Sequence, residues 1–131
     1  MFLTRECDYA IRVVRGLADM ELKTVKAICD SEGIPQPFAY KVLKKMERAG
    51  IVSARRGVSG GYMLAKPLEG LKLFDIVKAV DNSLFISECL QPGFVCTHNS
   101  NGNFCSVHKE FARVQEQLIK TLSEKSIKEI F

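Results

Sequence analysis

Three cysteines and one histidine are concentrated in a short stretch of the chain, with the spacing Cys89-x6-Cys96-x8-Cys105-x2-His108. Thiolates and an imidazole are ligands that suit iron–sulfur clusters and zinc. The stretch is rich in Gly and Asn, so its backbone is able to wrap around a bound group. A C-x2-C pair, which is common in tight metal motifs, is missing. The pattern therefore predicts a metal or cluster site, and redox-active or inert thiols remain as alternatives.

Other candidate ligands have simpler explanations. Cys7 and Cys29 lie in helical patterns, where a free cysteine usually acts as a small buried apolar residue. His98 is a spare ligand candidate in the cysteine stretch, although a lone loop histidine is usually solvated. Asp8 falls in the first turn of a predicted helix, where a carboxylate normally just complements the helix dipole.

Positive charge is concentrated in residues 35–66, which carry a net charge of +6, whereas the whole chain carries +4. A phosphate backbone rewards such a patch through counterion release. The alternative is a solvated cationic face with no partner. The basic residues of this segment are Lys41, Lys44, Lys45, Arg48, Arg55, Arg56 and Lys66.

The elements that position these residues follow from apolar spacing and capping signals. A helix is predicted over 4–20 with Thr4 as its N-cap, a short helix from Thr24 to near Gly33, and a third helix over 37–49 that ends at Gly50. Strands are predicted over 51–56 and 62–65, around a glycine-rich turn. This order is the plan of a winged helix–turn–helix, mostly α with a small β-hairpin.

In such a motif the N-terminal end of the recognition helix, here the third predicted helix over 37–49, contacts base edges. Glutamine can bridge an adenine and lysine can reach guanine acceptors, whereas later basic residues contact phosphates. Core packing is the alternative for the two aromatic residues of this helix. The predicted DNA contacts are Gln36, Phe38, Tyr40, Lys41, Lys44, Lys45 and Arg48 in the helix and Arg55, Arg56, Ser59, Gly60 and Gly61 in the hairpin.

The C-terminal third has a different character. A helix is predicted over 73–81, and residues 84–104 show no sustained period, which in a small domain indicates a functional or disordered loop. The helical period then returns over roughly 28 Å of helix, so long that we expect it to pack outside its own subunit. Ser126 is predicted to cap a last short turn. The apolar positions of the long helix are Phe104, Val107, Phe111, Val114, Leu118 and Leu122.

Length and composition exclude several classes. The 131 residues suit one domain with an appendage, and 47% hydrophobic against 26% charged residues is ordinary for a globular protein. No apolar run approaches the length of a membrane helix, and the N-terminus carries charge where a signal peptide needs apolar residues. We therefore expect a cytoplasmic protein with no membrane association, in which the five cysteines do not form a disulfide framework.

Three segments, taken together, resemble the IscR/NsrR/CymR family of bacterial winged-helix regulators, the Rrf-two family. They are Leu3-Thr4 with Asp8-Tyr9-Ala10, the wing sequence from Arg56 to Ala65, and Ile76-Val77-Lys78-Ala79-Val80-Asp81. The resemblance covers about residues 2–125, and the wing is its most specific part.

This resemblance implies a homodimer, joined through the long C-terminal helix, that binds a pseudo-palindromic double-stranded DNA operator. It also implies an iron–sulfur cluster held by Cys89, Cys96 and Cys105. IscR-like members add a histidine to a 2Fe-2S cluster, which matches His108. NsrR-like members add an N-terminal aspartate of the other subunit to a 4Fe-4S cluster, which matches Asp8. The cysteine gaps here are wider than in those members, and some members carry no cluster.

We therefore expect a winged helix–turn–helix domain over 1–83, a cluster-binding loop over 84–105 and a dimerisation helix over 106–131. The expected function is a transcriptional regulator, acting as a repressor, whose operator affinity responds to redox state, nitric oxide or iron–sulfur status. A cluster-free regulator that responds to thiol oxidation, zinc or a partner protein is the alternative. A small iron–sulfur electron carrier or thiol redox enzyme would leave the basic hairpin unexplained.

Overall fold

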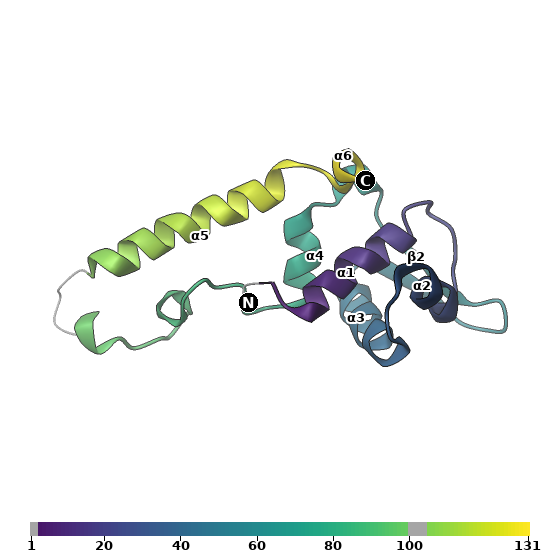
Figure 1. The fold of residues 1–131 in the computed structure, drawn as a ribbon, viewed down its shortest axis with the longest axis horizontal. Coiled ribbons are helices and arrows are strands. Elements are labelled where there is room, and N and C mark those ends of the chain that lie inside the picture. Colours follow the sequence, from purple (N-terminus) through teal and green to yellow (C-terminus); the bar gives the residue numbers. More distant parts are fainter. Residues whose placement is uncertain (1–2, 100–104) are drawn as a thin grey trace.

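The structure is a computed structural model that describes residues 3–99 and 105–131. Its N-terminal half begins with three helices, α1 (Arg5–Gly16), α2 (Val25–Glu32) and α3 (Gln36–Arg48) (Figure 1). The predicted cap of the first helix is confirmed, because the Thr4 hydroxyl accepts a hydrogen bond from the Cys7 N–H. The second helix begins after Thr24, as predicted, and the Thr24 hydroxyl caps it by accepting a hydrogen bond from the Ala27 N–H. Helix α1 ends earlier than predicted, and the turn that follows it places Met20 at a φ of 64°.

A two-stranded antiparallel hairpin follows, made of β1 (Val52–Arg55) and β2 (Gly61–Leu64), as predicted. The hairpin is also attached to the connection between α1 and α2. The Lys23 N–H donates to the Tyr62 carbonyl and the Tyr62 N–H donates to the Lys23 carbonyl, both at 2.8 Å. This bridge fixes the base of the wing to the helix–turn–helix, and the tip projects away from the helices (Figure 1).

The hydrophobic core lies where α1, α3 and α4 (Leu73–Val80) pack together. The predicted apolar face of α3 is confirmed, because Ala39, Val42, Leu43 and Met46 are fully buried. Cys7 and Cys29 are buried as well, as predicted for structural thiols. Burial raises the pKa of the Cys29 thiol, which keeps it protonated and unreactive.

The C-terminal part forms an arm that extends from this core (Figure 1). After η1 (Leu68–Gly70) and α4, the chain runs outward through η2 (Glu88–Leu90) and η3 (Thr97–Asn99), and α5 (Ser106–Glu124) returns to the core. Phe104, the first position of the predicted long helix, lies outside the described residues. Within the described ranges, no helix is long and apolar enough to cross a membrane.

Helix α6 (Ile127–Ile130) anchors the inner end of this arm. Ile127 is fully buried and its N–H donates to the Leu71 carbonyl at 2.8 Å. The Ser126 hydroxyl and N–H both donate to the Glu129 carboxylate, which confirms Ser126 as the cap. The ammonium of Lys72 donates to the Glu124 carbonyl at 3.1 Å at the end of α5. The long helix is therefore tied at one end to the segment between the hairpin and α4.

Candidate functional site

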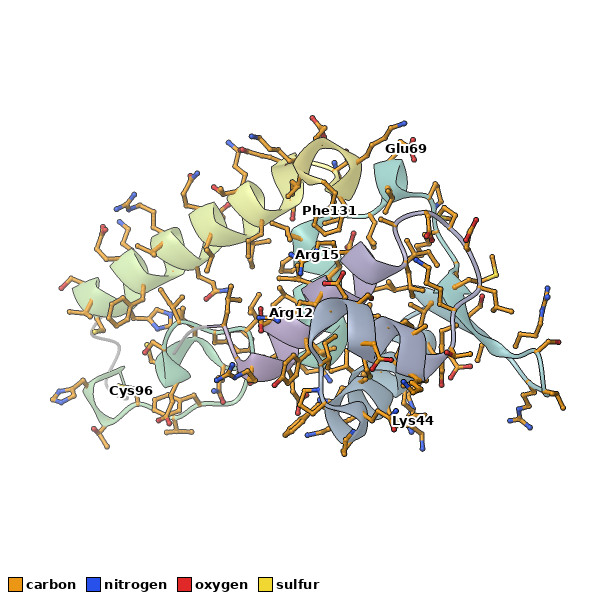
Figure 2. The ribbon with its side chains drawn as sticks, turned by 45° about the vertical axis from the view of Figure 1, so that its right-hand side comes forward. Arg12, Arg15, Lys44, Glu69, Cys96 and Phe131 are labelled. Carbon is orange, nitrogen blue, oxygen red and sulfur yellow. The ribbon has the colours of Figure 1, made fainter. Side chains whose placement is uncertain are left out.

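Helix α3 exposes one side to solvent along its whole length. Its buried face is apolar, so Gln36, Lys41, Lys44 and Arg48 all lie on the exposed face. Figure 2 shows Lys44 projecting outward from the helix. This arrangement follows from the helical period, because the apolar positions of α3 recur at spacings of three and four residues. The predicted helix contacts are thus accessible to a large partner.

The two aromatic side chains of α3 are exposed rather than buried in the core. The Tyr40 side chain is 54% exposed and that of Phe38 is 46% exposed. The Phe38 ring lies 5.5 Å from the ring of Tyr9 on α1, centroid to centroid, which holds it at the edge of the helix pair. Because the first turn of α3 presents both rings to solvent, both are available for contact with bases or sugars.

Two of the predicted DNA-contacting lysines are paired within the protein. Glu6 on α1 accepts hydrogen bonds from Lys41 and Lys45, and the Lys45 ammonium lies 2.5 Å from the Glu6 carboxylate. Lys45 also donates to the Val80 carbonyl at 2.8 Å, at the end of α4. These two ammonium groups, that of Lys41 foremost, lower the pKa of the Glu6 carboxyl. Lys45 therefore joins three helices, in addition to its predicted role at a phosphate.

Replacing Glu6 with glutamine is expected to have two opposite effects. Duplex DNA affinity at low salt should rise roughly fivefold, because Lys41 and Lys45 lose a competing carboxylate. The free energy of unfolding at neutral pH should fall by about 1 kcal/mol. Folding lowers the pKa of the Glu6 carboxyl below its ordinary value of 4.5, so the ionised carboxylate stabilises the folded protein fully above pH 4.5. This stabilisation is lost as the pH falls through the lowered pKa of the folded state. The stability difference should therefore vanish as the pH falls through that lowered pKa.

Fluorescence anisotropy with a labelled duplex and urea unfolding at several pH values would measure both effects. Glu116→Gln, which removes an exposed carboxylate on α5, is the matched control. An affinity that falls, or that rises equally in the control, would contradict competition between Glu6 and the DNA backbone.

The wing presents its two arginines at an exposed hairpin. Arg55, Arg56 and Ser59 are exposed, and Val58 at the tip is fully exposed. The glycines have a structural role that the sequence analysis missed. A Cβ atom on Gly60 would lie 2.2 Å from the Arg55 carbonyl oxygen, and one on Gly61 would lie 2.3 Å from the Lys23 carbonyl oxygen. The fold itself therefore requires both glycines, apart from any DNA contact.

The three thiols of the predicted cluster site lie along the arm, far from α3. Figure 2 shows Cys96 at the outer end of the molecule, on the opposite side from Lys44. Cys89 lies in η2, Cys105 precedes the first residue of α5, and His108 follows in its first turn. All three thiols are half-buried and free, and the Cys89 sulfur lies 3.3 Å from the Ser87 hydroxyl oxygen.

The described parts of the chain do not gather these ligands into one group. In residues 3–99 and 105–131, no three His, Cys, Asp or Glu side chains lie close enough together to hold a metal ion. Asp8 is instead paired with Arg12 on the same helix, 3.1 Å away. His98 is exposed. Thiolates with an imidazole or a carboxylate suit a cluster. To bring them together, residues 84–105, hereafter the cysteine segment, would have to rearrange or a second chain would have to take part.

Gln115 on α5 holds the start of the cysteine segment. Its side-chain amide is 8% exposed, accepts from the Ile86 N–H at 2.9 Å and donates to the Leu84 carbonyl at 2.7 Å. A buried amide with both hydrogen bonds made is costly to remove. Apolar periodicity could not reveal this residue, because it is a polar position beside the apolar stripe of the helix. It attaches the cysteine segment to the long helix.

Helix α5 carries an apolar stripe that the described part of the chain leaves exposed. Val107, Phe111 and Val114 are 56%, 40% and 44% exposed. They are spaced by four and three residues, the spacing of a helix–helix contact. A shallow groove on the same helix, lined by Arg113, Val114, Gln117, Leu118 and Thr121, continues this stripe.

Comparison with known proteins identifies relatives over nearly the whole chain. The sequence model of the Rrf2 family, described as an iron-dependent transcriptional regulator, matches residues 3–131. Protein aau3 of Rhizobium meliloti (strain 1021) is 34% identical over 95 residues, 71% of this chain and 62% of that protein. The NsrR transcriptional regulator of Oceanobacillus iheyensis is 32% identical over 96 residues, 71% of this chain and 65% of that protein. The chain spans about six-tenths of the length of these curated relatives.

Solved structures share the fold at low sequence identity. IscR of T. potens superposes with a TM-score of 0.74 at 18% identity, over 97% of this chain and 83% of that chain. The oxidized form of Staphylococcus aureus CymR gives a TM-score of 0.71 at 18% identity, over 98% of this chain and 94% of that chain. The family model and the O. iheyensis relative are both described as transcriptional regulators. With a family match that extends from Leu3 to the last residue, this chain belongs to the Rrf2 family of transcriptional regulators.

Proposed function

We propose that this protein is a homodimeric DNA-binding transcriptional repressor whose operator affinity is switched through its cysteine segment. The DNA-binding part of this proposal rests on one observation: the exposed basic side of α3 lies beside a wing that carries two exposed arginines. A helix of this size fits the major groove, and arginine side chains of a wing enter the adjacent minor groove. Phosphate pairing then supplies affinity, while the exposed first turn of α3 supplies sequence preference.

The unpartnered stripe on α5 supports a dimer. Exposed apolar residues along a helix of 19 residues are costly in water, and a second copy of the same helix would bury them. A two-fold dimer would present two α3 helices to successive major grooves, which matches a pseudo-palindromic operator. The dimer contact and the DNA contact use opposite parts of the chain, so both can form together.

Replacing Val114 with glutamate is expected to convert the dimer to a folded monomer. A charge at the middle of the stripe would be buried without a partner, at a cost of several kcal/mol. Analytical ultracentrifugation should then report about half the mass, and operator affinity should fall at least tenfold. Glu116→Lys, a charge change on an exposed neighbouring position, is the control. A variant that keeps the wild-type mass would show that this stripe is not the dimer contact.

The cysteine segment is the part of the chain best suited to hold an iron–sulfur cluster. Cys89, Cys96 and Cys105 would supply three thiolates, and His108 or Asp8 of the second subunit would supply the fourth ligand. When bound, a cluster of either the 2Fe-2S or the 4Fe-4S type supplies an iron centre that reacts with oxygen, nitric oxide or electron donors. A single nitrogen or oxygen ligand binds iron less tightly than a thiolate, which suits a sensor rather than a permanent centre.

The chain also offers a route from this segment to α3. Gln115 attaches residues 84–86 to α5. The inner end of α5 and the following α6 are in turn attached to Lys72 and Leu71, in the segment that connects the wing to α4. A rearrangement of the cysteine segment would therefore change the position of α5 relative to the winged domain. Because half-site spacing is a strict geometric requirement, a small shift changes operator affinity strongly.

The decisive experiment is anaerobic purification followed by visible absorption and iron and sulfide analysis. The wild-type protein is expected to be brown, and Cys96→Ala is expected to be colourless yet folded, because Cys96 contributes nothing to the core. Cys29→Ala removes a buried structural thiol and is the matched control, which should keep its colour. A colourless wild-type protein under these conditions would reject the cluster.

Three further variants identify the fourth ligand. His108→Ala should change the visible spectrum if the imidazole ligates iron, and Asp8→Ala should change it if the partner's carboxylate does. Asp8 is held by Arg12 in the single chain, so Arg12→Ala should strengthen ligation by Asp8 and leave ligation by His108 unchanged. A spectrum that none of the three variants changes would exclude both residues.

A second candidate function is the same regulator without a cluster. It is favoured by the three thiols that stay separate and free in the described chain. Thiol oxidation, zinc or a partner protein would then supply the signal, and the S. aureus CymR relative is named for its oxidized form. A colourless preparation with stoichiometric zinc, or with a disulfide after peroxide treatment, would support this alternative.

A further inference from the structure

A basic cleft lies where the C-terminal end of α3 meets α4 and the base of the wing. Its volume is about 520 Å³, within the range of roughly 300–1,000 Å³ that is typical of small-molecule sites. Lys45 and Arg48 of its lining are also predicted DNA contacts, whereas neither the DNA-binding nor the cysteine-segment proposal uses the cleft itself. The residues that matter for the argument are Lys45, Arg48, Lys66, Lys78, Ile51 and Val80.

Four cations from three segments of the chain line this cleft, whereas it has one carboxylate. Arg48 and Lys66 are exposed and, within the described chain, have no ion-pair partner. The Lys78 ammonium lies 5.7 Å from the centre of the Phe74 ring. The carboxylate is that of Asp75, which accepts from the Lys72 N–H at 2.9 Å and serves as a helix cap. The cleft therefore carries more positive charge than its one carboxylate can neutralise.

Apolar residues form part of the cleft lining. Ile51 and Val80 form part of the lining and are 2% and 5% exposed, and two alanines, Ala49 and Ala79, lie beside them. Asn82 adds a side-chain amide at the rim. A cleft lined by both cations and apolar residues suits a ligand that has both a multiply charged anionic group and an organic ring.

The cleft lies at the far end of α3 from the residues predicted to read bases. A helix of 13 residues is roughly 18 Å long, so Arg48 is about that far from Gln36. Lys66 and Ile51 flank the base of the hairpin, opposite to its tip. A ligand in this cleft would not occupy the first turn of α3 or the wing tip.

We propose that this cleft binds a nucleoside polyphosphate. Guanidinium and ammonium groups around one cavity favour phosphates, which offer several negative charges and bidentate acceptors for arginine. The apolar part of the lining would accept the base or sugar. Lys45, which also binds Glu6 and the end of α4, would take part, so binding would be felt by α1 and α3 together.

The test is a fluorescence titration of the full chain with N-methylanthraniloyl-ATP. Saturable binding is expected, with displacement by unlabelled ATP and little displacement by adenosine or inorganic phosphate. Lys66→Ala/Lys78→Ala should weaken binding by about tenfold or more, and both lysines are exposed, so the fold should persist by circular dichroism. Lys26→Ala/Lys120→Ala, which removes two exposed lysines elsewhere, should stay within about twofold of wild type.

Several outcomes would overturn the proposal. They are the absence of saturable binding, equal weakening in the two double variants, displacement by inorganic phosphate as effective as by ATP, and stoichiometric displacement by duplex DNA. The last result would assign the cleft to the DNA-binding surface. Any of the other three results would mean that the lysines and the arginine of the cleft bind no nucleotide and only complement the dipoles at the C-terminal ends of α3 and α4.

Discussion

Replacing Arg55 and Arg56 with alanine is expected to weaken binding to a duplex of arbitrary sequence by roughly 100-fold at low salt. Both side chains are exposed on the wing and neither forms an ion pair in the described chain. A dimer would lose four cations that face the phosphate backbone or the minor groove. Their loss removes counterion release and leaves the folded core unchanged.

The salt dependence gives the sharper measurement. For the wild-type dimer, contacts to about six to eight phosphates predict a slope of log affinity against log salt near −5 to −7. The double variant should reduce that slope by about 3 to 4. Anisotropy titrations of a labelled duplex at several KCl concentrations measure both slopes, with Lys26→Ala/Lys120→Ala as the charge-matched control. A variant slope equal to that of the wild type would show that the wing does not touch the DNA backbone.

Replacing Gly61 with alanine is expected to destabilise the protein by roughly 2–4 kcal/mol. The added Cβ would lie 2.3 Å from the Lys23 carbonyl oxygen and 2.7 Å from its carbon, and backbone atoms cannot move aside as a flexible side chain can. The paired hydrogen bonds between Lys23 and Tyr62 would have to break or shift. The wing would then lose its attachment to the helix–turn–helix, and DNA affinity should fall with stability.

Urea unfolding followed by circular dichroism measures this effect. Gly70→Ala is the matched control, because a Cβ there has no neighbour nearer than the Pro67 ring at 3.8 Å. It should change the free energy of unfolding by less than about 1 kcal/mol. If Gly61→Ala were as mild as Gly70→Ala, the bridge between Lys23 and Tyr62 would not be what fixes the wing.

Much of the winged domain could be predicted from sequence because its signals are local. Thr4, Thr24 and Gly33 mark helix ends through their own side chain or backbone, and the apolar period of α3 decides which side is exposed. The stripe on α5 is equally local, since it depends on one helix. The candidate DNA contacts followed directly, because exposed basic positions on one helix face can be counted along the chain.

Glu6, Gln115 and the bridge at Lys23 could not be predicted in this way. Each depends on a partner more than 25 residues away, and the chain contains many other carboxylates, amides and backbone groups that could have formed the same bonds. The cysteine spacing identified ligands of the right kind, but spacing in a loop does not determine whether thiols meet. In the described chain they remain apart.

The residue order alone determined the order of helices and strands, the basic side of α3 and the kind of ligand that the thiols suit, because capping, periodicity and donor chemistry act within a few residues. Tertiary structure decided which lysines are paired with Glu6, why Gly61 must lack a Cβ, and that a basic cleft forms beside α4. Those features arise from contacts between distant segments, whose geometry is set only when the core packs.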